Sequence, residues 1–123
     1  MSLHRSQGGF TLIELIAILV ILGVLASIAV PKYYDITKEA QNRAALQAVT
    51  EGKARLSVQY ARLFLNNGSP PGVSSLVDAV GVTTSVGDYT LNLSTADTLT
   101  IKINATGKVG VQGTNSGVWL KPR

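Results

Sequence analysis

The sequence predicts an α+β protein in which one long N-terminal helix packs, through its second half, on a small antiparallel β-sheet. Three observations support this prediction. An apolar run over residues 10–30 has the length of a membrane-spanning helix. The segment that follows, to Leu65, repeats apolar side chains every three or four residues. From Tyr89 onward the apolar period becomes two, as in half-buried strands.

The apolar run contains a single charged residue, Glu14. At about 1.5 Å per residue, the run is long enough to cross a hydrocarbon core of roughly 30 Å. A charged side chain at the centre of a bilayer costs roughly 2.5–3.5 kcal/mol on insertion scales. Glu14 lies near the start of the run, so its cost is smaller. It either marks the membrane interface or requires a partner of opposite charge.

The second half of the predicted helix is amphipathic, and the whole helix is expected over residues 10–65. Its apolar stripe consists of Ala45, Val49, Gly52, Leu56, Tyr60 and Phe64. Charged residues occupy the other faces. Glu39 with Arg43, and Glu51 with Arg55, form i,i+4 pairs in the favourable order, each contributing about 0.2–0.5 kcal/mol.

Two residues weaken the helix within the apolar run. Pro31 has no N–H, so the carbonyl of Ser27 loses its helical partner. Gly23 costs about 1 kcal/mol relative to alanine. The segment between them is expected to bend or unwind most easily, which predicts a kink in the isolated chain.

Turn residues over positions 66–72 end the long helix. A short helix follows from Ser75, with Ser75 and Asp78 as a capping box and Gly81 as the stop. Strands are expected over residues 89–93 and 99–103, around residues 109–111, and over residues 118–120, with residues 113–117 as a flexible loop. They form a three- or four-stranded antiparallel sheet.

Composition argues against several kinds of function. The 123 residues include no cysteine and one histidine, His4, and the formal net charge of +4 is diffuse. No catalytic cluster, zinc spacing or nucleic-acid site is evident, so we expect no enzyme activity, no cofactor and no metal. Asp88 and Asp97 are interpreted as turn residues rather than calcium ligands. Tyr33 and Tyr34 resemble an aromatic belt at a membrane interface.

The start of the apolar run carries a specific motif, Gly8-Gly9-Phe10-Thr11-Leu12-Ile13-Glu14-Leu15. It resembles the class III signal peptide of type IV pilins and pseudopilins, and the resemblance extends to about Ala45. It implies that a prepilin peptidase cuts between Gly9 and Phe10 and methylates the new amine of Phe10. Glu14, Gly23 and Pro31 match residues typical of the family. Many major pilins of the family close their C-terminal region with a disulfide, which has no counterpart in this cysteine-free sequence.

The resemblance implies three segments: a cleaved leader (residues 1–9), a transmembrane and assembly helix (residues 10–31), and a globular part made of an amphipathic helix and a small sheet (residues 32–123). The expected function is that of a structural subunit of a type IV pilus-like filament, serving adhesion, motility or DNA uptake. The apolar helices would form the filament core, where Glu14 would pair with the Phe10 ammonium of a neighbouring copy. Gly23 and Pro31 would bracket a segment that melts in the filament.

The partners implied are further copies of the chain, the inner membrane before assembly, the prepilin peptidase, and the pilus or secretion machinery. The chain would begin in the inner membrane and end in an extracellular filament. One alternative is a pseudopilin of a type II secretion system in a periplasmic rod, although the tail from Gly110 lacks the acidic residues of a major pseudopilin. A second is a monomeric, single-span membrane-anchored binding module that keeps residues 1–9.

A third alternative is a secreted soluble domain cleaved after Ser27-Ile28-Ala29, a small-x-small site. Glu14 would then interrupt the apolar region of the signal peptide. Two N-x-S/T sequences, at Asn92 and Asn104, match a glycosylation acceptor pattern that is common by chance.

Overall fold

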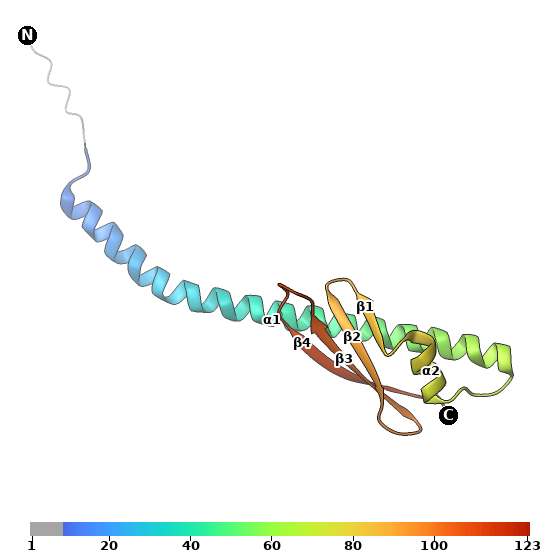
Figure 1. Cartoon of the computed structure of the whole chain (residues 1–123). Coiled ribbons are helices and arrows are strands. Elements are labelled where there is room, and N and C mark those ends of the chain that lie inside the picture. Colours follow the sequence, from blue (N-terminus) through green and yellow to red (C-terminus); the bar gives the residue numbers. More distant parts are fainter. Residues whose placement is uncertain (1–8) are drawn as a thin grey trace, which may run out of the picture. The chain divides into compact units, whose positions relative to one another are not determined.

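The structure, a computed structural model, describes residues 9–123. Its elements follow in the order α1 (Leu12–Asn67), α2 (Val73–Val80), β1 (Thr83–Val86), β2 (Tyr89–Thr95), β3 (Thr100–Gly107) and β4 (Thr114–Leu120) (Figure 1). The chain divides into two compact units, one ending at Ile36 and one formed by Thr37–Arg123. The predicted α+β class is confirmed.

Helix α1 begins two residues later and ends two residues later than predicted. Its end follows the expected turn chemistry, because Gly68 has a φ of 65° and donates its N–H to the carbonyl of Phe64 at 2.9 Å. Both predicted i,i+4 ion pairs form, with 3.1 Å between Nε and Oε1 in Arg43–Glu39 and in Arg55–Glu51. The helix is continuous through Gly23 and Pro31.

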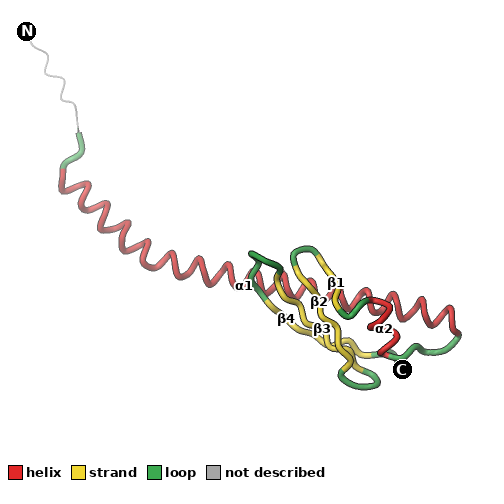
Figure 2. Tube along the Cα trace, viewed as in Figure 1, coloured by secondary structure: helices red, strands yellow, loops and turns green. Residues whose placement is uncertain are grey.

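The four strands form one antiparallel sheet in which the spatial order equals the chain order (Figure 2). One face of the sheet packs on the second half of α1 to make the core. The buried sheet residues are Tyr89, Leu91, Leu93, Ile101, Ile103, Ala105 and Trp119. Of the predicted helical stripe, Ala45, Val49, Gly52 and Leu56 are buried and Tyr60 is partly buried. Phe64 is 41% exposed and stacks on Tyr60 instead.

Two glycines allow the helix and the sheet to approach closely. A Cβ added to Gly52 would lie 2.8 Å from Cδ1 of Leu91, and one added to Gly117 would lie 2.6 Å from Cγ1 of Val49. Any side chain at these two positions would push α1 away from the sheet.

The C-terminal strand corrects the sequence prediction. Residues 109–111 are a turn and loop rather than a strand, and the predicted flexible loop over residues 113–117 belongs largely to β4. Strand β1 was not predicted. Composition does not indicate a strand in either place. Strand β4 begins with small polar residues and contains Gly117. Strand β1 has the sequence Thr-Thr-Ser-Val, which shows no clear apolar period.

Helix α2 also differs from its prediction at its start. It begins at Val73 rather than Ser75, with Gly72 as N-cap and no side-chain cap, so the predicted Ser75–Asp78 capping box was wrong. Burial of Val73, Leu76 and Val77 decides where this helix lies. Its end is as predicted, because Gly81 has a φ of 99° and donates its N–H to Val77.

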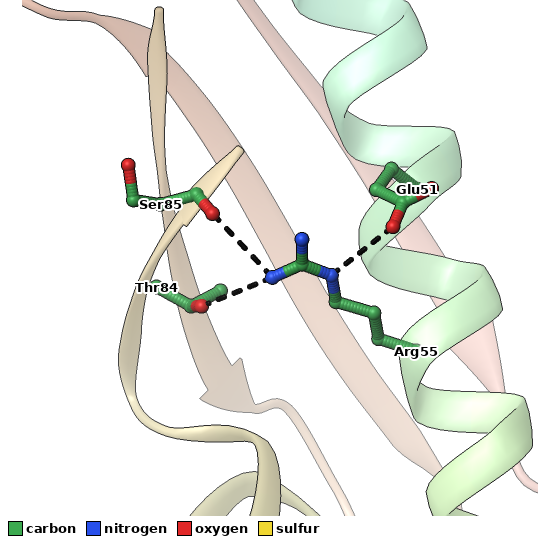
Figure 3. A network of polar contacts seen from close by, with 4 residues as sticks. All are labelled: Glu51, Arg55, Thr84 and Ser85. Carbon is green, nitrogen blue, oxygen red and sulfur yellow. Dashed lines mark hydrogen bonds and ion pairs between the residues drawn. The ribbon is translucent and has the colours of Figure 1, made fainter. Parts of the chain in front are cut away.

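Polar contacts complete the attachment of the sheet to α1. Tyr89 Oη donates to the carbonyl of Gln41 at 2.9 Å, and Trp119 Nε1 donates to Oγ of Ser57 at 3.0 Å. Arg55 reaches edge strand β1, where its Nη1 lies 3.4 Å from both Oγ1 of Thr84 and the carbonyl oxygen of Ser85 (Figure 3). These bonds fix the two outer strands as well as the centre of the sheet.

Candidate functional site

The predicted cleavage point lies in an open stretch of chain. Gly9, Phe10 and Thr11 precede α1 and are exposed, and a Cβ on Gly9 would meet nothing within 4 Å. A protease can therefore approach the Gly9–Phe10 bond without unfolding any element of the described chain. The rest of the predicted leader, residues 1–8, lies outside the described residues.

Thr11 and Glu14 form a capping box at the start of α1. The N–H of Thr11 donates to Oε2 of Glu14 at 3.2 Å, and the N–H of Glu14 donates to Oγ1 of Thr11 at 3.3 Å. This reciprocal pair satisfies N–H groups that a helix N-terminus leaves without partners. The carboxylate also lies at the positive end of the helix dipole.

Sequence reasoning missed this local role of Glu14, although the signal was present. Thr11-Leu12-Ile13-Glu14 has the T-x-x-E spacing of a capping box. The prediction started the helix at Phe10, which placed Thr11 inside it. Because Oε1 of Glu14 makes no hydrogen bond within the described residues, the carboxylate keeps the capacity to accept from another group.

The apolar run is exposed on every side within its own chain. No residue from Leu12 to Ile36 is buried, and the run contains the one stretch of the described residues that is apolar and long enough to cross a membrane. Side chains such as Ile13, Val20 and Ile28 are more than half exposed. A surface of this kind marks contact with lipid or with other proteins.

Gly23 and Pro31 lie in this exposed part of α1. A Cβ on Gly23 would meet nothing within 4 Å, so no residue that the structure describes requires a glycine there. Ser27, four residues before Pro31, donates its hydroxyl to the carbonyl of Val24 at 2.7 Å. The predicted kink and melting at this place stay predictions.

The residues considered for other chemistry have ordinary structural roles. Asp97 Oδ1 accepts the N–H of Leu99 at 2.7 Å, which is a local turn contact. Asp88 lies in the β1–β2 turn, and its carbonyl accepts the N–H of Lys108. Within residues 9–123, no group of three acidic, histidine or cysteine side chains is placed to hold a metal ion.

Comparisons with known proteins agree with the N-terminal motif. The family model of the prokaryotic N-terminal methylation motif matches residues 4–30. A fimbrial protein of Neisseria meningitidis serogroup A is 30% identical over 121 residues, which cover 97% of this chain and 69% of the relative. The type IV major pilin protein PilE of Neisseria gonorrhoeae is 30% identical over 121 residues, which cover 97% of this chain and 70% of the relative. The chain belongs to the type IV pilin family.

Some relatives match a shorter part of the chain at higher identity. A fimbrial protein of Pseudomonas aeruginosa is 41% identical over 64 residues, or 43% of this chain. No solved structure matches the pilin significantly. These relatives identify the chain as a structural subunit of a pilus, and they do not favour the pseudopilin or the monomeric membrane-anchored module.

Proposed function

We propose that this pilin is cut between Gly9 and Phe10 by a prepilin peptidase, methylated at Phe10, and polymerised into a filament of identical subunits. Residues 1–9 are the leader, residues 10–31 form the membrane and assembly helix, and residues 32–123 form the globular part. The precursor is held in the inner membrane until the pilus assembly machinery transfers it to the extracellular filament. The exposed apolar half of α1 is the observation that carries this proposal.

The apolar half requires an apolar environment that residues 9–123 of its own chain do not supply. Burial of apolar surface is worth about 25 cal/mol per Å² removed from water. In the membrane, lipid covers this surface, and in the filament, the same surface of neighbouring subunits covers it. The free-energy difference between these two environments is small, so the apolar effect alone does not define how subunits align.

Glu14 supplies the alignment. Cleavage creates an ammonium on Phe10, directly before the capping box. A charge in an apolar environment is very costly when isolated and tolerable when paired. Only one stagger between neighbouring helices brings Glu14 of one subunit to the Phe10 amine of another, so the pair selects the register. Oε1, which makes no hydrogen bond within the described chain, is available for this contact.

The segment between Gly23 and Pro31 is the part of α1 that we expect to lose helix in the filament. Pro31 removes one backbone hydrogen bond and Gly23 lowers helix propensity, so unwinding costs less here than in neighbouring turns. A filament map would show this directly. Continuous helical density from Val20 to Tyr34 would refute the melting.

Two substitutions at one position separate the capping role of Glu14 from its pairing role. Glu14→Gln keeps a side-chain oxygen for the N–H of Thr11 but removes the charge, whereas Glu14→Ala removes both. We expect both variants to be processed normally and to form few or no filaments, measured by electron microscopy of sheared fibres. Glu39→Gln, which removes an exposed carboxylate in the other half of α1, is the matched control and should assemble normally.

The outcome of Glu14→Gln decides between the two roles. Wild-type fibre yield from this variant would show that capping suffices and would exclude charge pairing. The N-terminus and intact mass of the native protein test the processing step. A start at methylated Phe10 is expected, whereas a start at Val30 would indicate ordinary secretion and an intact Met1 would indicate an anchored module.

A further inference from the structure

The face of the sheet that points away from the helices is here called the outer sheet face. Its larger part is polar, and two exposed apolar residues of β4, Val118 and Leu120, lie at one end of it. Side chains alternate along each strand, so the residues between the buried ones lie on this face. The register places them in rows across the four strands. One row is Thr83, Asn92, Asn104 and Ser116, and the next is Ser85, Thr90, Thr106 and Thr114.

These two rows contain only hydroxyl and amide side chains. Across the four strands, the outer sheet face has a single charged residue, Lys102. Charged residues make up roughly a quarter of a typical globular protein. The solvent side of α1 follows that rule, with the exposed residues Lys38, Glu39, Arg43 and Glu51. The chain as a whole is 15% charged, below the roughly 25% of a typical globular protein, and the outer sheet face is poorer in charge than the helix.

The centre of the outer sheet face contains two asparagines, a residue type that is uncommon in β-strands. Asn92 and Asn104 lie directly opposite each other on the two central strands. Asparagine is depleted in strands, so these positions sacrifice strand propensity for an amide side chain. Thr83 Oγ1 donates to Oδ1 of Asn92 at 3.2 Å, which orients that amide and leaves its N–H groups available.

A shallow hollow lies beside this centre, between β3 and β4. It has a volume of about 410 Å³ and is lined by Asn104, Ala105, Thr106, Thr114, Asn115 and Ser116. Four of these six residues belong to the two polar rows. These four residues line the open hollow with uncharged donors and acceptors.

We propose that the outer sheet face binds a neutral polysaccharide. Sugar hydroxyls both donate and accept hydrogen bonds, as do the hydroxyl and amide groups of the two rows. Within a row, neighbouring residues lie about 4.8 Å apart across the strands, and the two rows lie roughly 7 Å apart along the strands. An extended sugar chain therefore meets several equivalent groups. An anionic polymer would require a cluster of Lys or Arg, which this face lacks. Its exposed apolar residues, Val118 and Leu120, lie outside the two polar rows.

The test is retention of the full chain, purified in detergent, on two insoluble neutral polysaccharides, cellulose and chitin. We expect the wild type to be retained by at least one of them and not by immobilised heparin, an anionic polysaccharide. Asn104→Asp changes one amide to a carboxylate of nearly the same shape and should weaken retention about tenfold. Gln47→Glu, which adds the same charge on the exposed side of α1, should not change it.

Three results of the retention assay would overturn the proposal: no retention on either neutral polysaccharide, equal retention of wild type and Asn104→Asp, or preferential retention on heparin. A native mass showing that Asn92 or Asn104 already carries a glycan would overturn it as well. Folding of each variant is checked by the thermal transition of the single tryptophan, Trp119, which is buried in the sheet. Because the assay uses unassembled chain, its result does not depend on whether filaments form.

Discussion

The two halves of helix α1 have the same backbone structure and opposite surroundings. Over the apolar run, which ends at Val30, apolar side chains cover the helix on all sides and remain exposed, as Leu22 does at 55%. From Thr37 onward, apolar side chains form one stripe that the sheet covers, and Leu56 is 0% exposed. The comparison teaches that the distribution of apolar residues around a helix, rather than their number, determines whether the helix packs within its own chain.

The largest expected loss of stability comes from a leucine-to-alanine substitution in the second half of α1, compared with the same substitution in the first half. Leu56→Ala leaves a cavity in the core and should cost about 2–5 kcal/mol. The thermal transition of Trp119 should then fall by roughly 10 °C or more. Leu22→Ala leaves no cavity within the chain and should not move this transition in detergent. Equal shifts in both variants would contradict the contrast between the two halves.

Glycine-to-alanine substitutions should have opposite signs in the two halves. Gly52→Ala places a Cβ 2.8 Å from Cδ1 of Leu91, and the overpacking of about 1–3 kcal/mol exceeds the gain in helix propensity of about 1 kcal/mol. Gly23→Ala meets nothing within 4 Å and should stabilise its half of the helix by about 1 kcal/mol. Far-ultraviolet circular dichroism during heating measures both; a gain in stability for Gly52→Ala would show that Leu91 repacks freely.

A smaller effect is expected from a single hydrogen bond. Tyr89→Phe removes the hydroxyl that donates to the carbonyl of Gln41 and should cost about 1 kcal/mol. The same substitution at Tyr34, which is 70% exposed in the apolar half, should leave the Trp119 transition unchanged. If Tyr89→Phe also leaves it unchanged, this hydrogen bond does not contribute to holding the sheet on α1.

The smallest effects concern the two helical ion pairs. Glu39→Gln breaks a pair whose side chains are largely exposed, and should cost about 0.2–0.5 kcal/mol, less in high salt. Glu51→Gln should cost somewhat more, because its partner Arg55 also holds strand β1. Urea unfolding followed by Trp119 fluorescence compares the two variants, and a larger loss for Glu39→Gln would be inconsistent with these contacts.

Much of the helix could be predicted because its signals are local. The apolar run, the stripe from Ala45 to Leu56, and both ion pairs depend on spacings that a helix fixes by itself. The family was also predictable, since the motif around Phe10 and Glu14 is specific. The cleavage, the methylation and the Glu14 partner belong to other molecules, and therefore stay predictions.

The C-terminal strand could not be predicted from its composition. Gly117 and its neighbours resemble a flexible loop, but Gly117 is required because Val49 occupies the space of a side chain. That requirement depends on a residue of α1 far away in the sequence. Similarly, the opposition of Asn92 and Asn104 becomes visible only when the register of β2 and β3 is known.

The strand order β1-β2-β3-β4 also has a consequence for how the sheet forms. Each strand pairs with its neighbour in the sequence, so the contacts within the sheet have low contact order and its hairpins can close on a scale of about 1–10 μs. With no cysteine in the chain, this folding needs no oxidant or disulfide isomerase. Docking of the sheet on α1 is long-range by contrast, since Tyr89 and Trp119 bond to α1 residues 48 and 62 positions earlier, so the hairpins can close before the sheet packs on the helix.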